Sequence, residues 1–122
     1  MALTKTEYVK QGNDICEKAL ETKDAGVREA AKGVGNTAVA PPKKKLVAVA
    51  EEAILPVYQE LTKQLDELPS PVNDKARVER IMADYEAGLE RAEANPESLI
   101  AGTAFRNADR AAHAYGLKYC TL

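Results

Sequence analysis

Two cysteines, Cys16 and Cys120, lie near opposite ends of this 122-residue chain. An even, minimal number of cysteines is typical of a disulfide in an oxidising compartment. Closing a loop of about 100 residues would stabilise the fold by on the order of 4–5 kcal/mol in the chain-entropy model. Redox catalysis is disfavoured because it typically uses a Cys-X-X-Cys spacing. We therefore predict a Cys16–Cys120 disulfide, and the alternative is a pair of buried, reduced thiols in a cytosolic protein.

Four of the five tyrosines fall on the apolar faces of different predicted helices: Tyr8, Tyr58, Tyr85 and Tyr115. Tyrosines in such positions ordinarily pack in a core, with their hydroxyl groups hydrogen-bonded at its edge. Helical bundles also bind ligands between their helices, and these four side chains together would line such a pocket. They are the candidate ligand-binding residues of the sequence, and the ligand would be a small apolar molecule.

His113 is the single histidine, and no group of cysteines and histidines has the close spacing of a zinc site. Neither Ser70 nor Ser98 is marked out as an activated nucleophile for a Ser-His-Asp mechanism. A haem iron held between His113 and Met82 stays open as an alternative, although methionine at helical spacing ordinarily fills a core. We expect no catalytic residue, no metal site and no cofactor.

The 17 basic and 19 acidic residues give a formal net charge of -2, which argues against a nucleic-acid partner. The basic run at 43–45 indicates a solvated helix start, with contact to a membrane surface or an anionic ligand as the alternative. Glu86 and Glu90 share a helix face and would suit at most a weak Ca²⁺ site, so a solvated face is the simpler interpretation. No stretch approaches the ~18 apolar residues of a transmembrane segment.

Turn residues and apolar periodicity divide the chain into helices. Thr4 and Glu7 have the spacing of a capping box, so the first helix starts there. That helix is expected to fray between Thr22 and Gly26, and the glycines and prolines at 33–42 predict a loop free enough to act as a lid. The other predicted elements are a helix at 43–68 with a kink or restart near Pro56, a helix at 74–94, a short turn at 96–102, and a helix at 103–116 that Thr103 caps and Gly116 ends.

Short connections between these helices favour antiparallel neighbours. Many alanines, a single Phe and no Trp suit thin, closely packed helices better than a sheet. The length is that of one domain. We therefore predict an all-α fold: an up-down four-helix bundle in a single helical domain of residues 1–122, with its N- and C-terminal segments joined by the disulfide.

Four short segments carry a resemblance to a known kind of protein: LTKTEY (3–8), NDIC (13–16), LDELPSP (65–71) and AYGLKYC (114–120). They are similar to segments of small secreted or lipid-anchored helical proteins of actinobacteria, which have one cysteine in the first helix and another at the C-terminus. The resemblance implies a secreted or extracytoplasmic, disulfide-bonded domain, exported by a signal peptide that is not part of this sequence. It supplies no enzymatic residues and no specific function.

The leading functional hypothesis is an exported, non-enzymatic domain that binds a protein or a component of the cell envelope. Such a domain would act as a monomer or a weak homo-oligomer, without a transmembrane segment. The alternative is a carrier for a small apolar ligand held between the helices near the tyrosines. An enzyme is the third hypothesis, and it would require a cluster of perturbed ionisable groups in a cleft.

Overall fold

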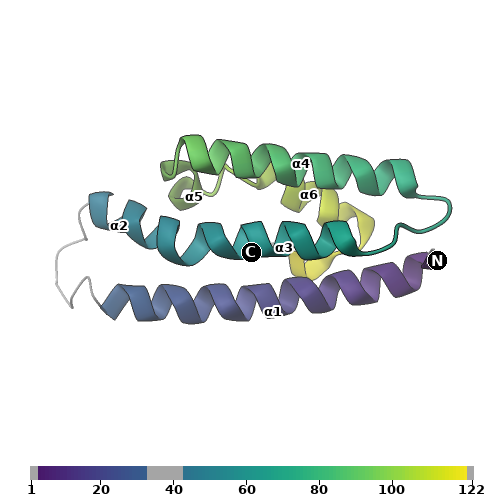
Figure 1. The fold of residues 1–122 in the computed structure, drawn as a ribbon, viewed down its shortest axis with the longest axis horizontal. Coiled ribbons are helices and arrows are strands. Elements are labelled where there is room, and N and C mark those ends of the chain that lie inside the picture. Colours follow the sequence, from purple (N-terminus) through teal and green to yellow (C-terminus); the bar gives the residue numbers. More distant parts are fainter. Residues whose placement is uncertain (1–2, 33–42, 121–122) are drawn as a thin grey trace.

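The computed structural model describes residues 3–32 and 43–120, and every regular element in these two ranges is helical (Figure 1). The predicted all-α fold is therefore confirmed, whereas the predicted loop and lid at 33–42 lie outside the described residues. The elements are, in chain order, α1 (Lys5–Lys32), α2 (Lys43–Val49), the π-helical η1 (Ala50–Ile54), α3 (Leu55–Glu67), α4 (Lys75–Ala94), α5 (Glu97–Ala101), α6 (Arg106–Tyr115) and the 3-10 turn η2 (Lys118–Cys120).

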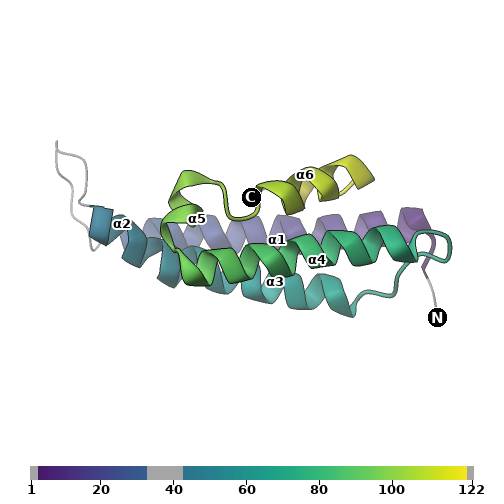
Figure 2. The same cartoon turned by 90° about the horizontal axis from the view of Figure 1, so that it is seen from above.

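Successive helices of the bundle alternate in direction. The continuous segment of α2, η1 and α3 returns beside α1, and α4 then runs antiparallel to α3 (Figure 1). The chain turns back through α5 into α6, which lies on one face of the layer formed by the longer helices (Figure 2). α3 packs against both α1 and α4, and α6 packs against α4. This is the predicted up-down four-helix bundle, with a short fourth helix.

The first helix starts as its sequence predicts. The backbone N–H of Thr4 donates to Glu7 Oε1 and the backbone N–H of Glu7 donates to Thr4 Oγ1, both at 3.1 Å. The predicted fraying between Thr22 and Gly26 is wrong, because α1 continues without interruption to Lys32. Gly26 faces Ala53 of η1, and a Cβ at Gly26 would lie 3.4 Å from the Ala53 Cβ. Packing of this kind stabilises a helix beyond its local propensity.

A π-helical turn replaces the simple kink expected near Pro56. The backbone N–H of Leu55 donates to the carbonyl of Ala50, five residues earlier, and α3 then begins with Pro56 in its first turn. An N–H in the first turn of a helix has no intrahelical acceptor, so the missing donor of proline is tolerated there. The predicted restart is confirmed, and it takes the form of a wider π-helical turn followed by a new α-helix.

The last two helices end as predicted, but the start of α6 differs. Gly102 ends α5 with a φ of 72°, and Gly116 ends α6 with a φ of 114°, both in the left-handed region that favours glycine. Thr103 does not cap α6, which begins at Arg106 after Phe105. The backbone N–H of Thr103 instead donates to the carbonyl of Ser98 at 3.0 Å, so Thr103 belongs to the end of α5.

The core lies where α1, α3, α4 and α6 meet. Close approach of the chain before α6 to α4 depends on Gly88, because a Cβ there would lie 2.5 Å from Phe105 Cδ1 and 2.9 Å from the carbonyl oxygen of Ala104. Tyrosines supply much of the bulk that a chain without Trp needs in its core. The largest fully buried side chains are Tyr8, Cys16, Leu61, Leu65, Tyr85, Tyr115, Leu117 and Cys120.

Candidate functional site

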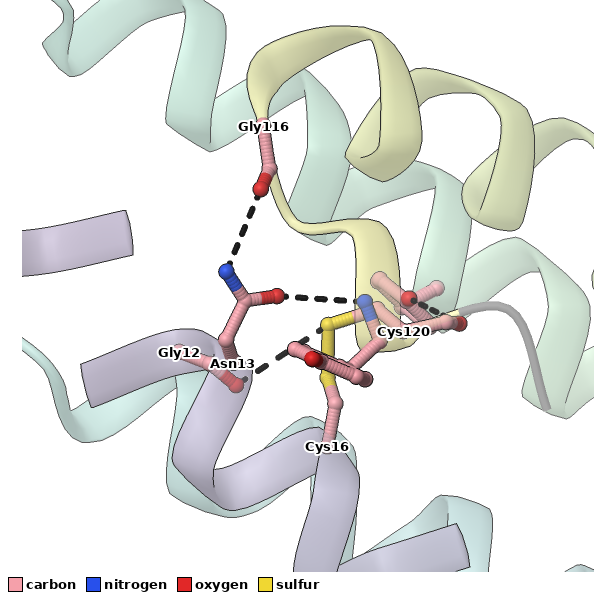
Figure 3. The surroundings of a disulfide bond; sticks show 7 residues. Gly12, Asn13, Cys16, Gly116 and Cys120 are labelled. Carbon is pink, nitrogen blue, oxygen red and sulfur yellow. Dashed lines mark hydrogen bonds between the residues drawn. A yellow bond between two sulfur atoms is a disulfide. The ribbon is translucent and has the colours of Figure 1, made fainter. Parts of the chain in front are cut away.

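The disulfide joins the first helix to the last turn of the described chain. Cys16 on α1 and Cys120 in η2 are bonded, their Cα atoms are 4.8 Å apart, and both residues are fully buried (Figure 3). The predicted Cys16–Cys120 pairing is confirmed. Thiol exchange requires access of an attacking thiolate to a sulfur atom, so burial makes this bond a structural clasp.

Asn13 holds the same C-terminal segment by hydrogen bonds, one turn before Cys16. Its side-chain Nδ2 donates to the carbonyl of Gly116 at 3.2 Å, and its Oδ1 accepts from the backbone N–H of Tyr119 at 3.1 Å (Figure 3). The neighbouring Gly12 permits the close approach, because a Cβ there would lie 2.6 Å from Leu117 Cδ2. The sequence shows no local signal for the Asn13 contacts, since both partners are more than 100 residues away.

The four tyrosines predicted to face inward are all buried. Tyr8 and Tyr115 meet edge to face, with ring centroids 6.0 Å apart. Tyr58 stacks on Phe105 at a centroid distance of 3.7 Å, and Tyr85 lies tilted beside the same Phe105 ring at 6.3 Å. The tyrosines thus form two groups of aromatic contacts, one at the end of α6 and one around Phe105. Both are typical of core packing.

Their hydroxyl groups have different surroundings. Tyr115 Oη donates to Asp74 Oδ2 at 2.7 Å, and Tyr85 Oη donates to the carbonyl of Cys120 at 3.5 Å. Tyr8 Oη is buried and has no hydrogen-bond partner among the described residues, and burial raises the pKa of Tyr8 to about 12. Tyr58 lines a cavity, described next. Binding of one ligand by all four tyrosines stays a prediction.

A cavity of about 270 Å³ lies between α1, η1, α3, α5 and α6, and we call it the Asp109 cavity. Apolar and polar groups contribute nearly equal shares of its wall, and its charged side chains are Lys23 from α1 and Asp109 from α6. The π turn contributes Ile54, so the break before Pro56 shapes this cavity. The full lining is Lys23, Ile54, Tyr58, Ser98, Leu99, Gly102, Ala104, Phe105 and Asp109.

Asp109 is the most strongly perturbed acidic group of the site. Its Oδ1 is buried and accepts no hydrogen bond from any described residue. Burial raises its pKa from 3.8 to about 7, against the lowering effect of the Lys23 ammonium group. The negative charge of Asp109 in turn adds to the effect of burial in raising the pKa of Tyr58 and Tyr85. A carboxyl group that changes charge near neutral pH inside a cavity is a candidate functional group.

Asp109 belongs to no sequence motif, but its helical spacing indicates that it faces inward. Asp109 lies four residues after Phe105 and three before Ala112, and both of these residues are buried. An acidic residue at this spacing shares the inward face of the helix. Asp109 also borders a second, more open hollow with Arg106, Arg110 and His113.

The residues considered for haem binding, Ca²⁺ binding and nucleophilic catalysis do not form a common site. Met82 is buried on α4, whereas His113 is exposed on α6, so the structure gives no support to a shared haem. Glu86 and Glu90 are exposed on α4, Ser70 lies in the chain between α3 and α4, and Ser98 Oγ donates to the carbonyl of Asn95 at 2.7 Å. Among residues 3–32 and 43–120, no group of three His, Cys, Asp or Glu side chains is arranged to hold a metal ion.

Within the described part of the chain, no helix has the length and apolar character needed to cross a membrane. Comparison of the chain with protein-family models, with curated proteins and with solved structures found no match.

Proposed function

We propose that this chain is an exported, non-enzymatic helical domain that binds a protein or a component of the cell envelope. The observation that carries the proposal is the Cys16–Cys120 disulfide. Such bonds persist in secreted and extracytoplasmic proteins and are rare where cellular thiols are kept reduced. The resemblance of four segments to exported helical proteins points in the same direction.

The clasp also supports binding as the mode of action. The disulfide and Asn13 fix η2 against α1, so the C-terminal segment is held in one arrangement on the first helix. A surface fixed before binding loses less conformational entropy when a partner docks. The exposed faces of the helices carry interspersed charges of both signs, which suits a polar, hydrated contact.

Export is tested on protein recovered from the cells that naturally make it. Free thiols are alkylated before lysis, and the intact mass is then measured under denaturing conditions before and after reduction. We expect no alkylation and a gain of two hydrogen atoms on reduction. Recovery of the chain with both Cys16 and Cys120 alkylated would overturn the export proposal.

Partner binding is tested with the oxidised domain, labelled with a fluorophore, on a cell-envelope preparation from the same cells. We expect saturable retention that excess unlabelled oxidised domain displaces. The matched control is the Cys16→Ala/Cys120→Ala double variant, which lacks the clasp and is expected to be retained less. Retention that does not saturate, or none at all, would overturn the binding proposal.

A second candidate function is transport or storage of a small ligand held between the helices. The Asp109 cavity favours it, because a hollow of about 270 Å³ with aliphatic and aromatic side chains in its wall lies between the helices. Native mass spectrometry of protein from its own compartment tests this function directly. A bound small molecule that a Leu99→Phe variant fails to retain supports carriage, and a ligand-free spectrum for the unaltered protein contradicts it.

A further inference from the structure

We infer that the Asp109 cavity binds a small amine with an apolar body, whose ammonium group donates hydrogen bonds to the Asp109 carboxylate. The inference rests on the second proposed function, ligand carriage, and adds the chemical class of the ligand. It is independent of partner binding by the outer surface.

The size of the cavity sets the size of the ligand. An apolar cavity of about 150 Å³ is known to hold a benzene molecule. The Asp109 cavity measures about 270 Å³. It therefore has room for a ring or a branched chain of similar size together with a short polar arm, or about ten non-hydrogen atoms in all.

The wall of the cavity suits an apolar body. Ile54 and Leu99 contribute aliphatic surface from η1 and α5. Tyr58 and Phe105 contribute rings that are stacked on one another, with an angle of 4° between their planes. Because the stack fixes both rings, the wall is already formed before a ligand enters, which limits the entropy lost on binding.

Asp109 supplies the polar end of the site. Asp109 Oδ1 is buried without a donor, so an ammonium group in the cavity reaches the carboxylate at its other oxygen or after rotation of the side chain. Rotation about χ2 is broad for aspartate, so either oxygen can face the ligand. An ammonium donor forms a charge-assisted bond, roughly twice as strong as a neutral one. Lys23 lines the same cavity and lowers the pKa of Asp109, so its ammonium group favours the ionised carboxylate and also competes with a bound amine for it.

The probes are benzylamine, benzyl alcohol and toluene, which share a ring and differ in the donor. Each is titrated into the ¹⁵N-labelled, oxidised protein at pH 8, where Asp109 is mostly ionised and benzylamine is protonated. Amide shifts are followed by ¹H–¹⁵N NMR. We expect saturable shifts at cavity residues such as Leu99 and Phe105, and an affinity for benzylamine at least tenfold above that for benzyl alcohol.

Three variants separate the carboxylate from the cavity. Asp109→Asn keeps the shape and removes the charge, and we expect at least a tenfold loss of benzylamine affinity. Leu99→Phe fills the cavity and is expected to weaken all three probes. Asp84→Asn alters a half-buried aspartate on α4 outside the cavity and should leave every affinity unchanged. Circular dichroism of each variant checks that it is folded.

The outcomes distinguish the inference from the function beneath it. Equal affinities for benzylamine and toluene, or unchanged benzylamine binding by Asp109→Asn, would overturn the amine assignment and leave ligand carriage standing. Absence of saturable shifts with all three probes would overturn both. A tenfold preference for benzylamine that is lost in Asp109→Asn and retained in Asp84→Asn supports both.

Discussion

Asp109 couples the folding of this protein to pH. Its pKa is about 7 in the folded chain, whereas an aspartate in an unfolded chain titrates near 3.8. Between these two pH values the folded state holds a proton that the unfolded state has lost. The free energy of unfolding therefore falls as the pH rises from about 4 to about 7, because the unfolded state binds fewer protons in this window.

Asp109→Asn should remove this pH dependence. At pH 8 we expect the variant to be more stable than the unaltered protein by about 1 kcal/mol, since solvent screens part of the effect for a side chain that is not fully buried. At pH 5, where Asp109 is protonated in the folded state, the two should differ less. Urea unfolding at both pH values measures this, with Asp84→Asn as the matched control. A variant that gains nothing on going from pH 5 to pH 8 relative to the unaltered protein would contradict the assignment.

Removal of two tyrosine hydroxyl groups should change the free energy of unfolding in different ways. Tyr115→Phe deletes the hydrogen bond to Asp74, and we expect the free energy of unfolding to fall by about 1 kcal/mol. Tyr8→Phe deletes a hydroxyl without a partner among the described residues, so the variant should be as stable as the unaltered protein or up to about 1 kcal/mol more stable. Urea unfolding of both variants at pH 7 gives the comparison, and a clear loss of stability in Tyr8→Phe would show that its hydroxyl has a partner.

At the scale of the elements, two glycines inside helices carry different constraints. Gly88→Ala on α4 would press a methyl group against the Phe105 ring and the Ala104 carbonyl, so we expect a loss of about 1–3 kcal/mol. Gly26→Ala on α1 would place its methyl group in ordinary contact with Ala53, and its higher helix propensity should leave stability unchanged or raise it by about 0.5–1 kcal/mol. Thermal unfolding of the two variants tests the contrast. Equal effects would mean that propensity, not packing, decides both positions.

The elements that sequence predicts well are those set by their own residues. The capping box of Thr4 and Glu7 and the left-handed Gly116 are local, and both are confirmed. The restart at Pro56 is also confirmed, because proline alters the backbone of its own helix. The prediction that Thr103 caps the last helix is wrong, since the chain turns after Gly102 and brings Thr103 back onto Ser98.

Features that depend on contacts between distant segments could not be predicted from the local sequence. The continuity of α1 through Gly26 depends on contact with Ala53, and the need for Gly88 depends on Phe105. The Asp109 cavity requires five elements to meet, so periodicity marks Asp109 as inward-facing without showing that a hollow lies beside it. The inward tyrosines were predicted correctly, but their separation into two groups follows from the order in which the helices pack.

For the whole molecule, the C-terminal segment completes the bundle. α6 packs mainly on α4, and η2 contacts both α6 and α1. The fourth side of the bundle is thus closed by α6 together with η2, and the disulfide and Asn13 hold η2 in place. Because the fourth helix is short, this closure depends on contacts across a sequence separation of 104 residues.

The disulfide should therefore be the largest single contribution to stability that a point change can remove. The Cys16→Ala/Cys120→Ala variant is expected to lose about 4 kcal/mol, since the bond restricts the unfolded chain across a long loop. Because the effect lies largely in the unfolded state, the urea m-value should rise as the unfolded chain expands. Asn13→Ala removes two hydrogen bonds from the same clasp without freeing the chain, so it should cost about 1 kcal/mol with an unchanged m-value. Equal losses in the two variants would place the stabilisation in folded-state contacts and not in the loop that the disulfide closes.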